Sequence, residues 1–134
     1  METLMKTRAV RGAITVERND KEEILAATEE MLREVLERNE IQTEDLACII
    51  FTLTPDLNDV FPAVAARRMG ITDIPLMCMS EIPVAGALPK CVRLMALWNT
   101  EKQPKEIVHV YLREAVRLRP DLAEKTKEGK RSNG

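Results

Sequence analysis

The chain has 134 residues, of which 45% are hydrophobic and 31% are charged, and its formal net charge is −2. This length and composition are those of a single globular domain with a core of its own. A nearly neutral chain with 3% aromatic residues lacks the basic surface and the stacking side chains of a nucleic-acid binder.

The three cysteines, Cys48, Cys78 and Cys91, are odd in number and have no CxxC spacing, so neither a disulfide framework nor a zinc site is predicted. The single histidine, His109, excludes most metal sites and histidine-based triads. No apolar run is long enough to cross a membrane, and the first residues lack the apolar stretch of a signal peptide. We therefore expect a cytoplasmic protein that uses no metal or cofactor and binds neither nucleic acid nor membrane.

Residues 7–16 alternate with a period of two, which predicts a strand. One face of this strand would carry Arg8, Val10, Gly12, Ile14 and Val16. Arg11 would lie on the other face, among the small side chains of Ala9 and Ala13, which leave room beside it. A solvated arginine is the simplest interpretation of Arg11.

A helix is predicted after Asp20, which can cap it, with Glu23 three residues later in the position of a capping box. Large apolar residues then recur at helical spacing: Ile24, Leu25, Met31, Leu32, Val35 and Leu36. Fixing the backbone costs more than this stripe alone gains by burial. We therefore expect the helix to pack on one face of a sheet.

The remaining elements follow from apolar runs and their breakers. Residues 46–53 are continuously apolar, which predicts a strand buried on both faces. A short helix is predicted over residues 63–69 and ends at Gly70. Further strands are predicted over residues 74–79, 90–99 and 107–119.

The alternation is clearest in residues 107–119. One face would carry Val108, Val110, Leu112, Val116 and Leu118, and the other His109, Tyr111, Arg113, Arg117 and Arg119. The polar row is either a solvated sheet face or one wall of an anion site. After Pro120 the chain is polar, lysine-rich and without periodicity. We therefore expect one domain over residues 1–122 and a mobile polar tail over residues 123–134.

The expected fold is α/β (α+β), with a mixed five-stranded sheet, one long helix and one short helix. One long helix covers one face of such a sheet, yet residues 46–53 and 91–98 are apolar on both faces. The uncovered face must then meet another chain, which predicts a homo-oligomer whose interface includes strand faces.

Arg93 lies inside the apolar run 91–98, and burying a guanidinium costs several kcal/mol unless an anion meets it. Glu81 is one candidate for that anion, as a structural ion pair. A ligand is the other, with Glu81 serving a different polar group. Together with Arg11, and with Arg119 beside Tyr111, this set suits a small dianion that carries a hydroxyl group. Such a site can catalyse by holding a compact conformer and stabilising developing charge.

Segments spread in order from about residue 8 to residue 122 resemble the monofunctional chorismate mutases of the AroH class. They are Arg11-Gly12-Ala13, Thr15-Val16-Glu17-Arg18, Thr54-Pro55-Asp56-Leu57, Phe61-Pro62-Ala63, Cys78-Met79, Glu81, Gly86, Cys91-Val92-Arg93, His109-Val110-Tyr111-Leu112 and Leu118-Arg119-Pro120-Asp121-Leu122.

The resemblance implies an isomerase of the shikimate pathway that converts chorismate to prephenate by an intramolecular Claisen-type rearrangement, on the way to phenylalanine and tyrosine. It also implies a homotrimer with a pseudo-α/β-barrel core and active sites between subunits. Arg93 would face the breaking ether bond, Glu81 and the Cys78 backbone would hold the ring hydroxyl, and Arg11 and Tyr111 would grip a carboxylate. Further substrate-binding positions that the resemblance implies are Met77, Met79, Ser80, Phe61, Ala63, Arg67, Leu118 and Arg119.

Two positions depart from a relative in this family, since Val64 and Met77 stand where that relative carries Lys and Thr. Without a cation at position 64, the ring carboxylate is left to Arg67 or to solvent. Arg67 also suits a purely structural role in the last turn of the short helix, where cations complement the helix dipole. Two rival functions use the same arginines: a trimeric module that binds an anionic metabolite without reacting it, and a hydrolytic or deaminating enzyme of similar architecture.

Overall fold

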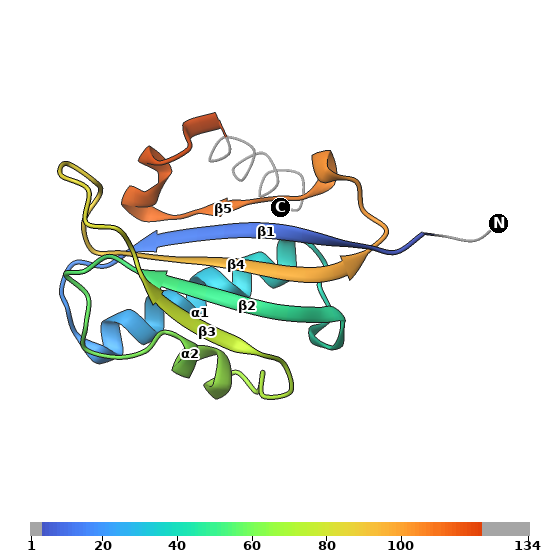
Figure 1. Ribbon diagram of the computed structural model, residues 1–134, viewed down its shortest axis with the longest axis horizontal. Helices are drawn as coiled ribbons and strands as arrows, with labels where there is room; N and C mark the ends of the chain where they lie inside the picture. Colours follow the sequence, from blue (N-terminus) through green and yellow to red (C-terminus); the bar gives the residue numbers. More distant parts are fainter. Residues whose placement is uncertain (1–3, 122–134) are drawn as a thin grey trace.

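The structure is a computed structural model that describes residues 4–121. Its strands and helices, shown in Figure 1, are β1 Lys6–Thr15, α1 Lys21–Arg38, β2 Leu46–Leu53, α2 Ala63–Arg68, β3 Leu76–Ser80, β4 Cys91–Thr100 and β5 Val110–Tyr111. Within the described residues there are also three short 3-10 turns: η1 Thr43–Asp45, η2 Pro104–Glu106 and η3 Arg113–Arg117. The predicted tail, residues 123–134, lies outside the described range.

The five strands form one sheet in the order β3-β2-β4-β1-β5. Strand β4 is antiparallel to both β1 and β2, whereas β3 runs parallel to β2 and β5 runs parallel to β1. The predicted mixed five-stranded sheet with one long and one short helix is therefore confirmed. Strand β3 begins two residues later than predicted, at Leu76.

Helix α1 begins where the sequence predicts. The Asp20 carboxylate accepts a hydrogen bond from the backbone N–H of Glu23 (3.0 Å), while the Glu23 carboxylate accepts one from the backbone N–H of Glu17 (3.3 Å). Glu23 thus also ties the helix start to the segment just after β1. Most of the predicted apolar stripe is buried, as Ile24, Leu25, Met31, Leu32 and Val35 show.

A close approach at Gly12 seats α1 on the sheet. A Cβ atom at Gly12 would lie 3.1 Å from side-chain atoms of both Met31 and Val35 and 3.3 Å from Leu94. This contact turns the even-numbered residues of β1 toward α1, as predicted. Arg11 consequently lies on the opposite face of the sheet.

Both helices pack on the same face of the sheet (Figure 1). On the other face, the side chains of Met77, Met79 and Met95 are 56%, 47% and 40% exposed. They lie side by side because Ile50 of β2 pairs with Met77 and with Met95. An apolar sheet face that no helix covers is therefore present within residues 4–121, as predicted.

The prediction of a strand over residues 107–119 is wrong. Only Val110 and Tyr111 pair with β1, and η3 follows them. The chain leaves the sheet at Arg113, whose φ of 55° is in the left-handed region. Tyr111 is 6% exposed, whereas the side chains of Arg113 and Arg117 are 44% and 71% exposed, so the alternating polar row does not form one continuous face.

Within residues 4–121, none of the helices combines the length and the apolar character that crossing a membrane would require.

Candidate active site

A hollow of about 710 Å³ opens on the sheet face that lies away from α1. Eight of the residues predicted for the site line it: Arg11, Met79, Ser80, Glu81, Arg93, Tyr111, Leu118 and Arg119. They come from β1, β3, β4, β5 and the segments just after β3 and η3. All four residues predicted as catalytic therefore share one cavity.

Strand register explains how Arg93 comes to face this hollow. Arg93 of β4 lies between Ala13 of β1 and Thr52 of β2. Ala13 also pairs with Tyr111 of β5, so Ala13 is the one residue between Arg93 and Tyr111 across the sheet. The small side chain of Ala13 leaves the guanidinium space that a larger residue would fill.

Arg93 and Glu81 form a bidentate pair. The Nε of Arg93 donates to Oε2 of Glu81 (2.8 Å), and Nη2 of Arg93 donates to Oε1. The Glu81 side chain is 13% exposed and the Arg93 side chain 45% exposed. In this structure, Glu81 is therefore the anion that the sequence predicts beside Arg93. The guanidinium still keeps a solvent-facing surface that a ligand can reach.

Opposing effects set the pKa of Glu81. Burial raises the pKa of this carboxyl, but the hydrogen bonds from Arg93 and Thr52 and the charge of Arg93 together bring it below its ordinary value. On the Arg93 side, the hydrogen bond to Glu81 raises the pKa of the guanidinium against the opposing effect of burial. Both groups are therefore charged at neutral pH.

Arg11 is held through its backbone as well as by strand pairing. Its N–H donates to Nδ1 of His109 (3.0 Å), two residues before Tyr111. An Nδ1 atom that accepts a hydrogen bond carries no proton, so the ring proton of His109 is on Nε2. This bond sets the start of β5 against β1, and with it the relative places of Arg11 and Tyr111.

Arg119 lies at the edge of the hollow with its side chain 43% exposed and paired with Asp121. The two hydrogen bonds of this pair are 3.2 Å and 3.1 Å long. The hydrogen bond and the charge of Asp121 raise the pKa of Arg119. Arg119 is thus an accessible cation at the mouth of the hollow.

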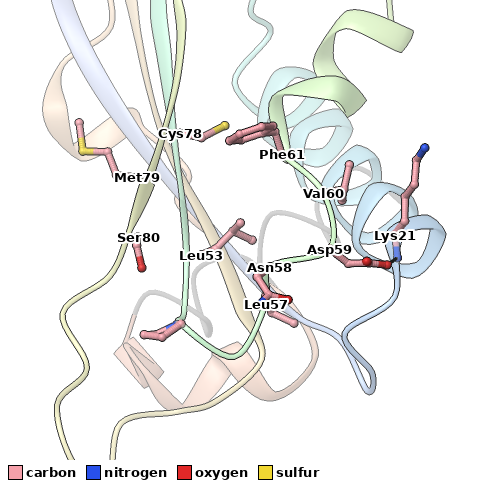
Figure 2. Close-up of a pocket in the computed structure, with 11 residues that line it drawn as sticks. Lys21, Leu53, Leu57, Asn58, Asp59, Val60, Phe61, Cys78, Met79 and Ser80 are labelled. Atoms are coloured by element: carbon pink, nitrogen blue, oxygen red, sulfur yellow. Dashed lines mark hydrogen bonds between the residues drawn. The ribbon is translucent and has the colours of Figure 1, made fainter.

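A second hollow of about 560 Å³ lies where β2 and β3 meet the loop before α2 (Figure 2). Phe61 and Cys78, both predicted for the site, line this second hollow, while Met79 and Ser80 line both hollows. Figure 2 shows the Cys78 side chain pointing toward the Phe61 ring and the Met79 side chain pointing the other way. Strand alternation therefore turns Cys78 into the second hollow, whereas its neighbour Met79 points the other way and lines both hollows.

The structure does not bring every predicted residue together. Met77, Ala63 and Arg67 line neither of these two hollows. Met77 faces outward from the open sheet face, Ala63 is 4% exposed at the start of α2, and Arg67 is exposed in its last turn. Within one chain, the predicted site is thus divided into a first group that lines the Arg93 hollow and a second group that lies outside it: Phe61, Ala63, Arg67, Met77 and Cys78.

Sequence reasoning missed two groups of contacts that hold the site. The Thr52 hydroxyl donates to Oε2 of Glu81 (2.5 Å). At the entry to β4, the backbone N–H of Cys91 donates to the Thr54 hydroxyl (3.0 Å), and that of Lys90 donates to the Asp56 carboxylate (2.9 Å). The polar break Thr54-Pro55-Asp56 was the available signal for the second group, whereas Thr52 is one threonine in an apolar strand.

Residues 4–121 contain no cluster of three or more histidine, cysteine, aspartate or glutamate side chains able to hold a metal ion.

The residues that line the site lie within the part of the chain that known proteins match. A family model described as chorismate mutase type I matches residues 7–122. The chain is 54% identical over 116 residues to Chorismate mutase AroH from Thermus thermophilus, covering 86% of this chain and 95% of that protein. It is 44% identical over 120 residues to Chorismate mutase AroH from Bacillus subtilis (strain 168), covering 89% and 94%. A solved structure of a chorismate mutase from Clostridium thermocellum superposes with a TM-score of 0.80 at 51% identity, covering 81% of this chain and 96% of that one.

Proposed function

The chain belongs to the type I chorismate mutase family and is an isomerase that converts chorismate to prephenate in aromatic amino-acid biosynthesis; on this premise, we propose that Arg93, Glu81, Arg11 and Tyr111 are its catalytic residues. The observation that carries this proposal is the Arg93–Glu81 pair, anchored by Thr52 and facing an open hollow.

We assign to Arg93 the role of lowering the activation barrier of the reaction. In the rearrangement, the ether bond lengthens ahead of carbon–carbon bond formation, so negative charge gathers on the ether oxygen. A guanidinium fixed beside that oxygen binds the transition state more tightly than the ground state, which raises kcat. Glu81 supports this role by holding two nitrogens of the Arg93 fork.

The other residues of the hollow bind and orient the substrate. Glu81 accepts a hydrogen bond from the ring hydroxyl, aided by the backbone of Cys78. Arg11 and Tyr111 bind a carboxylate, and Arg119 offers a further cation at the mouth, where Leu118 supplies an apolar wall. Holding the substrate in a compact conformer removes much of its entropic barrier. The rearrangement takes up no atom or electron from outside, so we propose no cofactor.

We infer that the active enzyme is a homotrimer of pseudo-α/β-barrel architecture with its sites between subunits. Two observations support this. The open sheet face carries exposed methionines that a second copy would cover. The predicted residues also fall into two groups, so a copy that brings Phe61, Ala63, Arg67, Met77 and Cys78 to the Arg93 hollow of its neighbour would complete the site.

The domain and compartment are part of the same proposal. We assign the catalytic domain to residues 1–122. The free thiols of Cys48, Cys78 and Cys91 fit a reducing cytoplasm. Of the rival functions, a module that binds its ligand without reacting it is not favoured, because both curated relatives are named for catalysis.

The test is the loss of chorismate absorbance on adding purified protein, without any added cofactor. Arg93→Ala is expected to lower kcat by about 10²–10³ while the thermal unfolding midpoint stays near that of the wild type. Arg93→Lys should also be poor, because an ammonium lacks the guanidinium fork.

Near-normal turnover by Arg93→Ala would contradict the assigned role. A variant that unfolds would instead identify the Arg93–Glu81 contact as a structural ion pair, which was the alternative left open by the sequence.

A further inference from the structure

Thr52 is a third partner of the Arg93–Glu81 pair, since its hydroxyl binds the Glu81 carboxylate. We propose that Thr52 is a positioning residue: its hydroxyl fixes the Glu81 carboxylate and, through it, the Arg93 guanidinium that faces the reacting ether oxygen. This inference rests on the catalytic roles proposed above for Arg93 and Glu81.

Three elements meet at one carboxylate. Thr52 Oγ1 of β2 donates to Glu81 Oε2 (2.5 Å), and the same oxygen accepts from Arg93 Nε of β4 (2.8 Å). The other oxygen, Oε1, accepts from Arg93 Nη2. Thr52 can reach the pair because it is the direct cross-strand partner of Arg93 and pairs on its other side with Met79, two residues before Glu81.

The side chains of Arg93 and Glu81 are both long, so the pair could swing as a unit without breaking its own hydrogen bonds. Glu81 also starts an exposed loop, in which Ile82 and Val84 are 81% and 63% exposed. Thr52, by contrast, lies on a central strand and has a β-branched side chain with a stiff χ1 angle. Its hydroxyl therefore ties the pair to a rigid point of the sheet.

The Thr52 hydrogen bond also favours the ionised form of Glu81. Burial raises the pKa of this carboxyl, whereas Arg93 from β4 and the Thr52 hydroxyl from β2 lower it, with a net lowering. If activity needs the carboxylate, it is lost as the pH falls through the folded-state pKa. Removing the hydroxyl removes one lowering contribution, so the loss should begin at a higher pH.

The experiment compares Thr52→Val, which keeps the shape of the side chain and removes the hydroxyl, with Thr52→Ser, which keeps the hydroxyl. For Thr52→Val, we expect kcat to fall about tenfold, equivalent to about 1.4 kcal/mol, and the acid limb of the kcat profile to move to higher pH. Thr52→Ser should recover most of kcat and restore the position of the acid limb.

Thr28→Val is the matched control. It removes a buried hydroxyl that donates to the backbone oxygen of Ile24 in α1 (2.7 Å), on the other face of the sheet. A purely structural loss of this kind should lower the thermal midpoint and leave kcat and the pH profile as in the wild type.

Three results would overturn the role of Thr52 without touching the proposed function: Thr52→Val with wild-type kcat and pH profile, equal losses in Thr52→Val and Thr52→Ser, or a shifted profile in Thr28→Val. If Thr52→Val does not fold, Thr52→Ala makes the same comparison without a second methyl group to accommodate. A wild-type protein that does not consume chorismate, or an Arg93→Ala variant that does so normally, would overturn the proposed function as well.

Discussion

Glu81 is the residue at which burial and charge most directly oppose each other, and this makes it a test of the pH dependence of stability. Burial raises the pKa of its carboxyl, and the contacts with Arg93 and Thr52 more than offset that effect. A carboxyl whose folded-state pKa is lowered contributes stability above its unfolded-state pKa, and this contribution is lost as the pH falls through the folded-state pKa.

We therefore expect Glu81→Gln to flatten the acid side of the stability curve. The variant should be less stable than the wild type at neutral pH, and the difference should shrink as the pH falls, because Gln cannot titrate. Thermal midpoints of both proteins measured at decreasing pH would test this. A constant difference at every pH would show that ionisation of Glu81 contributes nothing to stability.

At this same scale, the sequence led to the right pair of residues and missed their support. Arg93 and Glu81 were singled out because a charge in an apolar run demands a partner, and the structure pairs them. Thr52 gives no such signal, since threonine is a common residue in strands and does not need a charged partner. Its contact with Glu81 depends on the register of β2 with β3 and β4, which no local pattern specifies.

Among the elements, the contact of α1 with β1 depends most on a single position. Gly12 does not have a positive φ angle, so its importance lies in the missing side chain and not in backbone freedom. A Cβ atom there would be 3.1 Å from Met31 and Val35, closer than ordinary packing allows.

Gly12→Ala is accordingly expected to lower the free energy of unfolding by about 1–3 kcal/mol, the usual cost of overpacking a core. Urea denaturation of the wild type and the variant would measure it. Adding Val35→Ala should relieve the part of the clash that Val35 makes, so the double variant should lose less stability than the two single variants summed. Strict additivity would contradict a steric origin.

The elements that were predicted correctly have signals in their own residues, and the one that was wrong does not. Helix α1 has its cap at Asp20 and a continuous apolar stripe, and β2 is an unbroken apolar run. The alternating sequence over residues 107–119 does not correspond to alternating burial, since the buried residues there are Ile107, Val110, Tyr111 and Ala115. A strand of two residues followed by a 3-10 turn carries this sequence pattern, and the left-handed Arg113 that separates them has no sequence signature.

For the whole molecule, the uncovered sheet face was predictable by counting: one long helix cannot cover two apolar faces. The division of the site was not predictable in the same way. It depends on which side of the sheet Cys78 and Met79 face, and on the loop that places Phe61 opposite Cys78 (Figure 2). The sequence alone placed all these residues in one site without separating them into two groups.

The division leads to a test of where the sites lie. In the proposed trimer, Arg93 and Glu81 of one subunit would act with Phe61 of its neighbour. Arg93→Ala removes the cation from the first group. Phe61→Asp adds a carboxylate to the second group, where it would repel a dianionic substrate. Phe61 is 69% exposed, so its replacement should leave the fold of the subunit intact. Each variant alone is expected to be nearly inactive.

Mixed in equal amounts, unfolded and refolded together, the two variants should regain activity. A site is intact when its first group comes from a Phe61→Asp subunit and its second from an Arg93→Ala subunit, which random cyclic assembly gives for about a quarter of the sites. Mixing Arg93→Ala with Glu81→Gln is the control: both changes lie in the first group, so no intact site can form and activity should not recover. No recovery in the test mixture, although differently tagged subunits co-purify, would show that each site is built within one subunit. Recovery in the control would show that Arg93 and Glu81 of one site come from different subunits, against their pairing within one chain.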